Sequence, residues 1–191
     1  MPEKPALTAG EILVAEYSYV SQAIFQANED RSRVASFYMI TFGSFIAALI
    51  TYRFNFASGQ PAWVHWGFAG LFLALALMGL LTVLQLARLR HAWFEGLEAM
   101  NCIKEYYIAN FKGLEKAFAW RNDSLPAKFK PASVGFMLVI QVAILSGAAL
   151  GTAVFFITLA VSGSGWLLPA FVVGIGFCLL QIDTYRNMLK K

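Results

Sequence analysis

Apolar residues gather in four long runs along the chain, and the segments between them mix apolar with polar and charged positions. The runs cover residues 34–52, 62–87, 134–161 and 166–182. A hydrocarbon core about 30 Å thick is crossed by about 20 apolar residues of helix, so each run meets or approaches the length of a membrane span. Because lipid offers no hydrogen bonds to the backbone, such spans must be helical. The pattern predicts an all-α polytopic membrane protein, with four transmembrane helices in two hairpins and a single membrane domain over residues 1–191.

The polar segment before the first run has its own helical pattern. Thr8 and Glu11 have the spacing of a capping box, which predicts a helix start. No Gly or Pro lies between Gly10 and Gly43, so an amphipathic helix over residues 8–33 is expected to continue directly into the first span. Its apolar positions repeat every three or four residues, namely Leu13, Tyr17, Val20, Ile24 and Ala27. A helix with such a face requires a partner.

The segment after the second run supplies that partner. No proline interrupts it before Pro126, and a long helix is predicted over residues 88–120, followed by a loop over residues 121–133. The main apolar stripe of this helix comprises Leu89, Trp93, Leu97, Met100, Ile103, Tyr107, Phe111, Leu114 and Phe118. Beside it runs a second line of mostly small residues, the small-residue seam, formed by Ala92, Ala99, Cys102, Tyr106, Ala109 and Ala117. The first two spans are therefore expected to project from the membrane as a two-helix stalk, with one face for the N-terminal helix and the other for the third and fourth spans or a neighbouring subunit.

The distribution of charge predicts the orientation. All Lys and Arg residues except Arg53 fall in the N-terminal arm, in residues 88–130 or in the tail over residues 183–191. Under the positive-inside rule these three segments are cytoplasmic, and so are both termini. Aromatic residues cluster at the two short outer loops, as interfacial belts do: Tyr52, Phe54, Phe56, Trp63, Trp66 and Trp166. The composition, 59% hydrophobic and 14% charged, agrees with a membrane domain. The net charge of +4 needs no nucleic-acid partner to explain it.

Basic residues of the middle segment are the candidates for contact with anions. They are Arg88, Arg90, Lys104, Lys112, Lys116 and Arg121. Interleaved with aromatic residues such as Tyr107 and Trp120, this set could bind a nucleotide or another anionic ligand. Contact with anionic lipid, or simple solvation, is the more economical interpretation.

Small residues inside the spans predict close helix packing. Ala143, Gly147 and Gly151 repeat at four-residue spacing in the third run, and Gly174 and Gly176 lie in the fourth. Such faces let two helix backbones approach closely. The contact predicted is either the hairpin within one subunit or an interface between subunits.

Motifs for catalysis are not found. His91, Glu95 and Glu98 share one helix face and could in principle present ligands to a metal, but an exposed helix ordinarily carries such residues. No metal, cofactor or enzymatic activity is predicted. Asp183 and Arg186, three residues apart, are expected to form an ion pair at the membrane interface. Since no charge lies at the centre of a span, an ion-coupled carrier is disfavoured.

Two resemblances add to this reading. The pattern from Arg88 to Tyr107, Arg-Leu-Arg-His-Ala-Trp and later Ala-Met-Asn-Cys-Ile-Lys-Glu-Tyr-Tyr, resembles small bacterial four-span proteins that have no assigned function. The layout of the first 120 residues, a leading helix, a two-span hairpin and a long trailing helix, is similar to that of SLATT-type proteins, which are proposed to be pore-forming effectors. A second hairpin follows here, which departs from that plan. The resemblance implies a location in the bacterial inner membrane.

Two functions are therefore open. The first is a homo-oligomeric membrane effector, sensor or channel-like protein, in which the cytoplasmic stalk senses a ligand or partner and rearranges the spans. The second is a non-catalytic accessory or scaffold subunit that uses the same surfaces to dock on other chains of a larger membrane complex. Self-association or other membrane subunits are the partners expected, together with the lipid bilayer.

Overall fold

The computed structural model describes residues 8–51, 61–118, 120–131 and 133–190. Over these residues the chain is helical, without strands, and its elements follow in the order α1 (Ala9–Thr51), α2 (Ala62–Asn110), η1 (Leu114–Lys116), η2 (Asn122–Ser124), α3 (Val134–Ser162) and α4 (Leu167–Lys190). The four α-helices are each long and apolar enough to cross a membrane. The prediction of an all-α protein with four candidate spans is confirmed.

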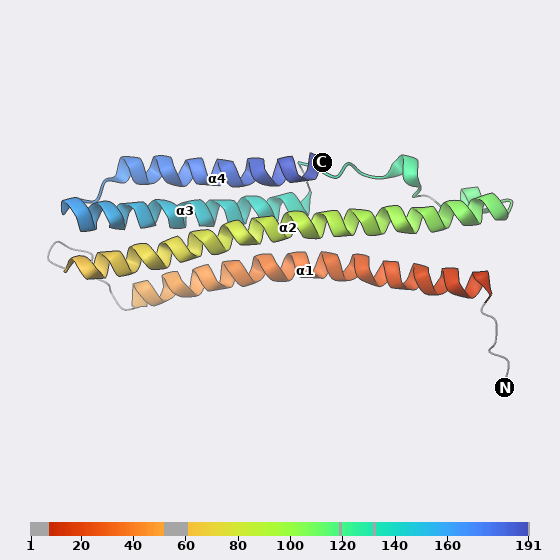
Figure 1. Cartoon of the computed structure of the whole chain (residues 1–191), viewed down its shortest axis with the longest axis horizontal. Coiled ribbons are helices and arrows are strands. Elements are labelled where there is room, and N and C mark those ends of the chain that lie inside the picture. Colours follow the sequence, from red (N-terminus) through yellow and green to blue (C-terminus); the bar gives the residue numbers. More distant parts are fainter. Residues whose placement is uncertain (1–7, 52–60, 119, 132, 191) are drawn as a thin grey trace, which may run out of the picture.

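The four helices lie along one another, with α2 packed between α1 and α3, and α4 against α3 (Figure 1). Both α1 and α2 continue well beyond the ends of α3 and α4. We call this part, residues 9–30 of α1 and 92–110 of α2, the extension. Within it the two helices touch closely, because a Cβ atom on Gly96 of α2 would stand only 2.7 Å from Cγ1 of Ile24 in α1.

The beginning of α1 has the predicted cap. The backbone N–H and the hydroxyl of Thr8 both donate to the Glu11 carboxylate, at 2.8 and 2.9 Å, and the Glu11 N–H donates to Thr8 Oγ1 at 3.4 Å. These reciprocal bonds satisfy N–H groups that the helix itself leaves without partners. From this cap α1 runs as one helix to Thr51, as the absence of Gly and Pro predicted.

Replacing Thr8 by alanine should therefore loosen the first turn of α1. The expected result is amide hydrogen exchange about threefold to tenfold faster at residues 9–12. Hydrogen bonds from Thr8 lower the pKa of Glu11 from its ordinary value of 4.5, so the cap is complete above that value and is lost as the pH falls through the lowered pKa. Exchange measured at two pH values in the wild type and in Thr8→Ala checks both statements, and equal rates in the two proteins would contradict them.

The end of α2 differs from the prediction. The helix stops at Asn110, whereas the apolar pattern predicted that it would continue to Phe118 within a segment ending at residue 120. Phe111 is extended, with φ −127° and ψ 109°, and Gly113 has a φ of 97°. A positive φ suits glycine, and here it turns the chain just after the helix. Leu114, the first residue of η1 after this turn, still matches the apolar spacing of the helix.

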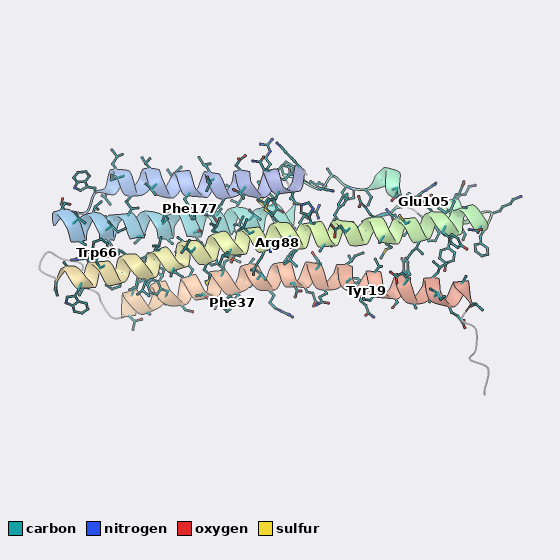
Figure 2. All side chains as sticks on the ribbon, viewed as in Figure 1. Tyr19, Phe37, Trp66, Arg88, Glu105 and Phe177 are labelled. Atoms are coloured by element: carbon teal, nitrogen blue, oxygen red, sulfur yellow. The ribbon has the colours of Figure 1, made fainter. Side chains whose placement is uncertain are left out.

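After η1 the chain returns along α2 toward the other helices. Arg121 donates two hydrogen bonds to the Glu105 carboxylate, both at 3.1 Å, and Lys104 Nζ donates to the Trp120 carbonyl at 3.3 Å. Figure 2 labels Glu105 on the extension, where this returning segment passes. Trp120 and the following residues, which open the loop predicted over residues 121–133, are thus fastened to the extension.

Glycines bring the backbones of α3 and α4 into contact. A Cβ on Gly147 would lie 2.6 Å from the Gly174 carbonyl oxygen, and one on Gly151 would lie 2.8 Å from the Ala170 carbonyl oxygen. Ala143 is fully buried. Gly176 differs from the other glycines predicted to pack, because a Cβ there would meet no atom within 4 Å. The small-residue faces meet within one chain, through Gly147, Gly151 and Gly174.

Several predicted features lie outside the described residues. They are Lys4 and Arg53, most of the first outer loop, and Tyr52, Phe54 and Phe56 of the aromatic belt. The remaining belt residues, Trp63, Trp66 and Trp166, are all more than half exposed. Figure 2 labels Trp66 at the end of the molecule away from the extension.

Candidate functional site

All four helices meet where the extension begins, and α1 contributes a buried arginine there. The buried positions of α1 follow one another at spacings of three, four and seven: Val20, Ala27, Arg31, Ala35 and Tyr38. Arg31 occupies the same face as its apolar neighbours, because residues four apart on a helix lie above one another. Its relative exposure is 7%.

Helix α2 contributes a second arginine to the same place. Arg90 is 8% exposed, and its guanidinium stacks 4.2 Å from the centre of the Trp93 ring. Its Nε donates to the Lys128 carbonyl at 3.1 Å, and Nη2 reaches the Ala127 carbonyl at 3.5 Å. The returning segment is therefore held at both ends, by Arg90 here and by Glu105 further along α2.

The first turn of α3 faces Arg31. The helix starts after Ser133, whose hydroxyl accepts the Phe136 N–H at 3.3 Å. The Arg31 guanidinium occupies the position where a Cβ of Gly135 would stand, so a larger residue at this position would require the guanidinium to shift. In the described part of the chain, the N–H groups of Val134 and Gly135 have no hydrogen-bond acceptor, as expected for the first residues of a helix.

Helix α4 closes the arrangement with Tyr185. The side chain is 2% exposed and its ring stacks on Phe136 of α3, with ring centres 6.1 Å apart. One turn away, the Met188 carbonyl lies 2.9 Å from His91 Nε2, which ties the end of α4 to α2. We call the group formed by Arg31, Arg90, Tyr185 and the first turn of α3 the four-helix junction. Figure 2 labels Arg88, two residues before Arg90, at the level where α4 ends.

The charged side chains at the four-helix junction are the two positive arginines. Burial lowers the pKa of Arg90, and the like charge of Arg31 lowers it further. Burial raises the pKa of the Tyr185 phenol, against the opposing effect of the two arginines. Both effects are those expected of groups that lie close together in a poorly hydrated place.

Carboxylates do not neutralise this charge. The ion pairs found within the described residues are Asp30 with Arg33 and Glu105 with Arg121. The predicted pair between Asp183 and Arg186 is not formed. The Asp183 carboxylate instead accepts a hydrogen bond from Asn187 at 2.8 Å, and the Arg186 guanidinium lies 5.8 Å from the centre of the Phe129 ring.

The basic residues proposed from the sequence do not form one site. Arg88, Lys112 and Lys116 are exposed, whereas Lys104 and Arg121 hold the returning segment. Of that set only Arg90 belongs to the four-helix junction. Arg31 belongs to the basic N-terminal arm, and its four-residue spacing from Ala27 places it on the buried face of α1.

The small-residue seam is open to its surroundings. Its members on α2, which are Ala92, Ala99, Cys102, Tyr106 and Ala109, are all exposed. Neither α3 nor α4 covers it, since α3 begins and α4 ends near the four-helix junction. Of the two partners predicted for the seam, the third and fourth spans are thereby excluded.

A second polar group lies within the bundle and takes residues from all four helices. Ser146 Oγ donates to the Ala76 carbonyl at 2.9 Å and accepts from Gln181 Nε2 at 3.1 Å. A Cβ on Gly79 would stand 2.6 Å from Ser146 Oγ and 2.8 Å from the Tyr38 hydroxyl. These bonds fasten α2, α3 and α4 together inside the apolar core.

A metal centre finds no support. Across residues 8–51, 61–118, 120–131 and 133–190, no group of three or more His, Cys, Asp and Glu side chains is arranged to hold a metal ion. His91, the strongest candidate in the sequence, is engaged with Met188. Cys102 and Cys178 are free thiols.

No family model matches the chain, and no curated protein or solved structure matches it either.

Proposed function

We propose that this protein is a non-enzymatic integral membrane protein, namely a homo-oligomeric membrane effector, sensor or channel-like protein. In this proposal the extension is a cytoplasmic stalk, both termini are cytoplasmic, and the host membrane is a bacterial inner membrane. A change at the stalk rearranges the spans of the oligomer. The proposal assigns no catalytic step.

The observation that carries the proposal is the continuity of α1 and α2. Each helix runs without interruption from its membrane-length apolar segment, through the four-helix junction, to the far end of the extension. Because helices are stiff over such lengths, a displacement of the extension is transmitted to the spans rather than absorbed by a hinge. Ile24 of α1 packs closely against Gly96 of α2, so the two helices are in direct contact within the extension.

Exposed apolar surface on the extension supports self-association. Large side chains of α1 that stand more than half exposed there are Ile12, Val14, Tyr19 and Phe25. In a segment outside the membrane such a surface marks an interaction site. The small-residue seam offers a second one on α2, where another helix could approach closely.

Native mass spectrometry of the protein extracted gently from its host membrane tests the proposal. An oligomer of this chain alone is expected, followed by ion flux in liposomes that contain it. Foreign subunits in fixed ratio would instead establish the alternative, an accessory or scaffold chain in a larger complex. That alternative is favoured by the same exposed surfaces and by the absence of a reactive site among the described residues.

Charges placed on the small-residue seam should dissociate the oligomer. Ala99→Glu together with Ala109→Glu puts two carboxylates on the exposed seam, where burying them between subunits would be costly. The expected result is an oligomer dissociation constant raised at least about a hundredfold. A second variant, Gln22→Glu with Gln26→Glu, adds the same charge on α1 beside the exposed Tyr19 and Phe25 and therefore separates the two surfaces: an oligomer that survives there but not in the seam variant is held by the seam. Association that survives in the seam variant would remove the seam from the proposal.

A further inference from the structure

The four-helix junction brings positive charge together from three sources. Two guanidinium groups, those of Arg31 and Arg90, lie more than nine-tenths buried. The third source is the N-terminus of α3, which carries a partial positive charge from the helix dipole. Burying like charges without a counter-charge is unfavourable, and no described carboxylate forms an ion pair with either arginine.

The donors at this place are also unused. Arg31 makes no hydrogen bond to any described residue, and neither does the Tyr185 hydroxyl. Val134 and Gly135 present backbone N–H groups in the adjoining first turn of α3. Arg90, by contrast, is already oriented by the carbonyls of Ala127 and Lys128, which hold its guanidinium in place.

We propose that the four-helix junction is a binding site for a phosphoryl oxyanion, held by Arg31, Arg90, the Tyr185 hydroxyl and the free N–H groups of the first turn of α3. An oxyanion supplies the negative charge that the site lacks. Its oxygens can also accept hydrogen bonds from the donors that the protein leaves without acceptors. Guanidinium groups and helix N-termini both suit phosphate. A neutral ligand, for example one that offers only an amide group, would leave the positive charge of the two arginines uncompensated.

The level of the site decides which phosphates can reach it. Arg31 precedes the first apolar run by three residues, Arg90 follows the second by three, and Gly135 lies at the start of the third. The junction thus lies at the boundary of the apolar segments, where lipid headgroups lie if all four runs span the membrane. The same chemistry fits the phosphodiester of an anionic lipid and a free phosphate, so the test must separate them.

The test compares the thermal unfolding of the full chain under three conditions. One uses micelles of an uncharged maltoside detergent, which contains no phosphate, the second the same micelles with phosphatidylglycerol, and the third the same micelles with inorganic phosphate against chloride at equal ionic strength. Stabilisation by phosphatidylglycerol alone assigns the site to a lipid headgroup. Stabilisation by inorganic phosphate assigns it to a free oxyanion. Either result supports the proposal, and stabilisation by neither overturns it.

Arg31→Gln is the most informative variant, because its effect on the melting temperature should differ in sign without and with the anion. Removing a buried charge that lacks a partner should raise the melting temperature by about 2 °C in the phosphate-free detergent alone. The same change should abolish the increment from the anion, with affinity falling at least about tenfold. The matched control is Arg33→Gln, which removes an exposed charge two residues away, with its side chain 76% exposed, and should retain the increment.

Tyr185→Phe keeps the ring that stacks on Phe136 and deletes only the hydroxyl. Its anion affinity should fall about threefold to tenfold with little change in basal stability, so the proposal can be tested even if Arg31→Gln fails to fold. If Arg31→Gln behaves as Arg33→Gln does, and Tyr185→Phe as the wild type, the site is not where we place it. The outcome is independent of oligomeric state, and the proposed function and this site can therefore fail separately.

Discussion

Replacing Gly147 by valine should destabilise the protein by about 3 kcal/mol, because the new side chain meets backbone rather than a movable side chain. A Cβ at this position would lie 2.6 Å from the Gly174 carbonyl oxygen and 3.0 Å from Cys178 Cβ. Neither helix can yield locally, since Gly151 approaches the Ala170 carbonyl one turn along the same contact. The variant must separate α3 from α4 over much of their length.

The matched control is Gly176→Val, in the partner helix. A Cβ on Gly176 would meet nothing within 4 Å, so the same substitution there should change the free energy of unfolding by less than about 0.5 kcal/mol. Reversible unfolding in mixed micelles measures both variants. Equal losses in the two proteins would show that α3 and α4 do not pack through Gly147.

The long helices were predictable because their signals are local. A capping box at Thr8 and an uninterrupted stretch to Gly43 define α1, and hydropathy alone identifies the four apolar segments. The end of α2 was predicted too late. Apolar spacing continues through Leu114, and the sequence pattern does not reveal that Gly113 takes a positive φ and turns the chain.

The four-helix junction was predictable only in part. The sequence indicates Arg90 only as one of several basic residues, and its burial depends on the returning segment, whose path no periodicity encodes. Arg31 had the spacing of a buried position, yet arginine near a membrane boundary is ordinarily read as an orienting charge. Tyr185 comes from the far end of the chain, and its approach to both arginines follows from tertiary packing alone.

Positive charges inside the four-helix junction differ from those outside it in the partners available to them. Outside the junction, cations such as Arg121 find a carboxylate or remain hydrated, and each exposed pair contributes little. Within the junction, Arg31 has no carboxylate partner among the described residues and is only 7% exposed. A single buried cation without a partner is therefore more informative about function than the larger number of lysines and arginines on the surface.

Gly79→Leu should be the most damaging substitution in the bundle, with an expected loss of about 4 kcal/mol. A Cβ there would stand 2.5 Å from Ser146 Cβ and 2.8 Å from the Tyr38 hydroxyl, so the leucine would push apart α1, α2 and α3 at one point. The displacement also breaks the bond from Ser146 to the Ala76 carbonyl and leaves Gln181 without its partner.

The contrast with Gly70→Leu isolates this cause, because both glycines lie in the apolar part of α2 and a Cβ on Gly70 would meet nothing within 4 Å. Gly70→Leu should unfold like the wild type, and Ser146→Ala should lose about 1–2 kcal/mol through the hydrogen bonds alone. If Gly79→Leu costs no more than Ser146→Ala, the crossing of three helices at Gly79 is looser than the structure indicates. If Gly79→Leu loses the full expected stability, the hydrogen bonds of Ser146 depend on a glycine that belongs to no sequence repeat. Gly79 is required because Ser146 of α3 and Tyr38 of α1 both approach it.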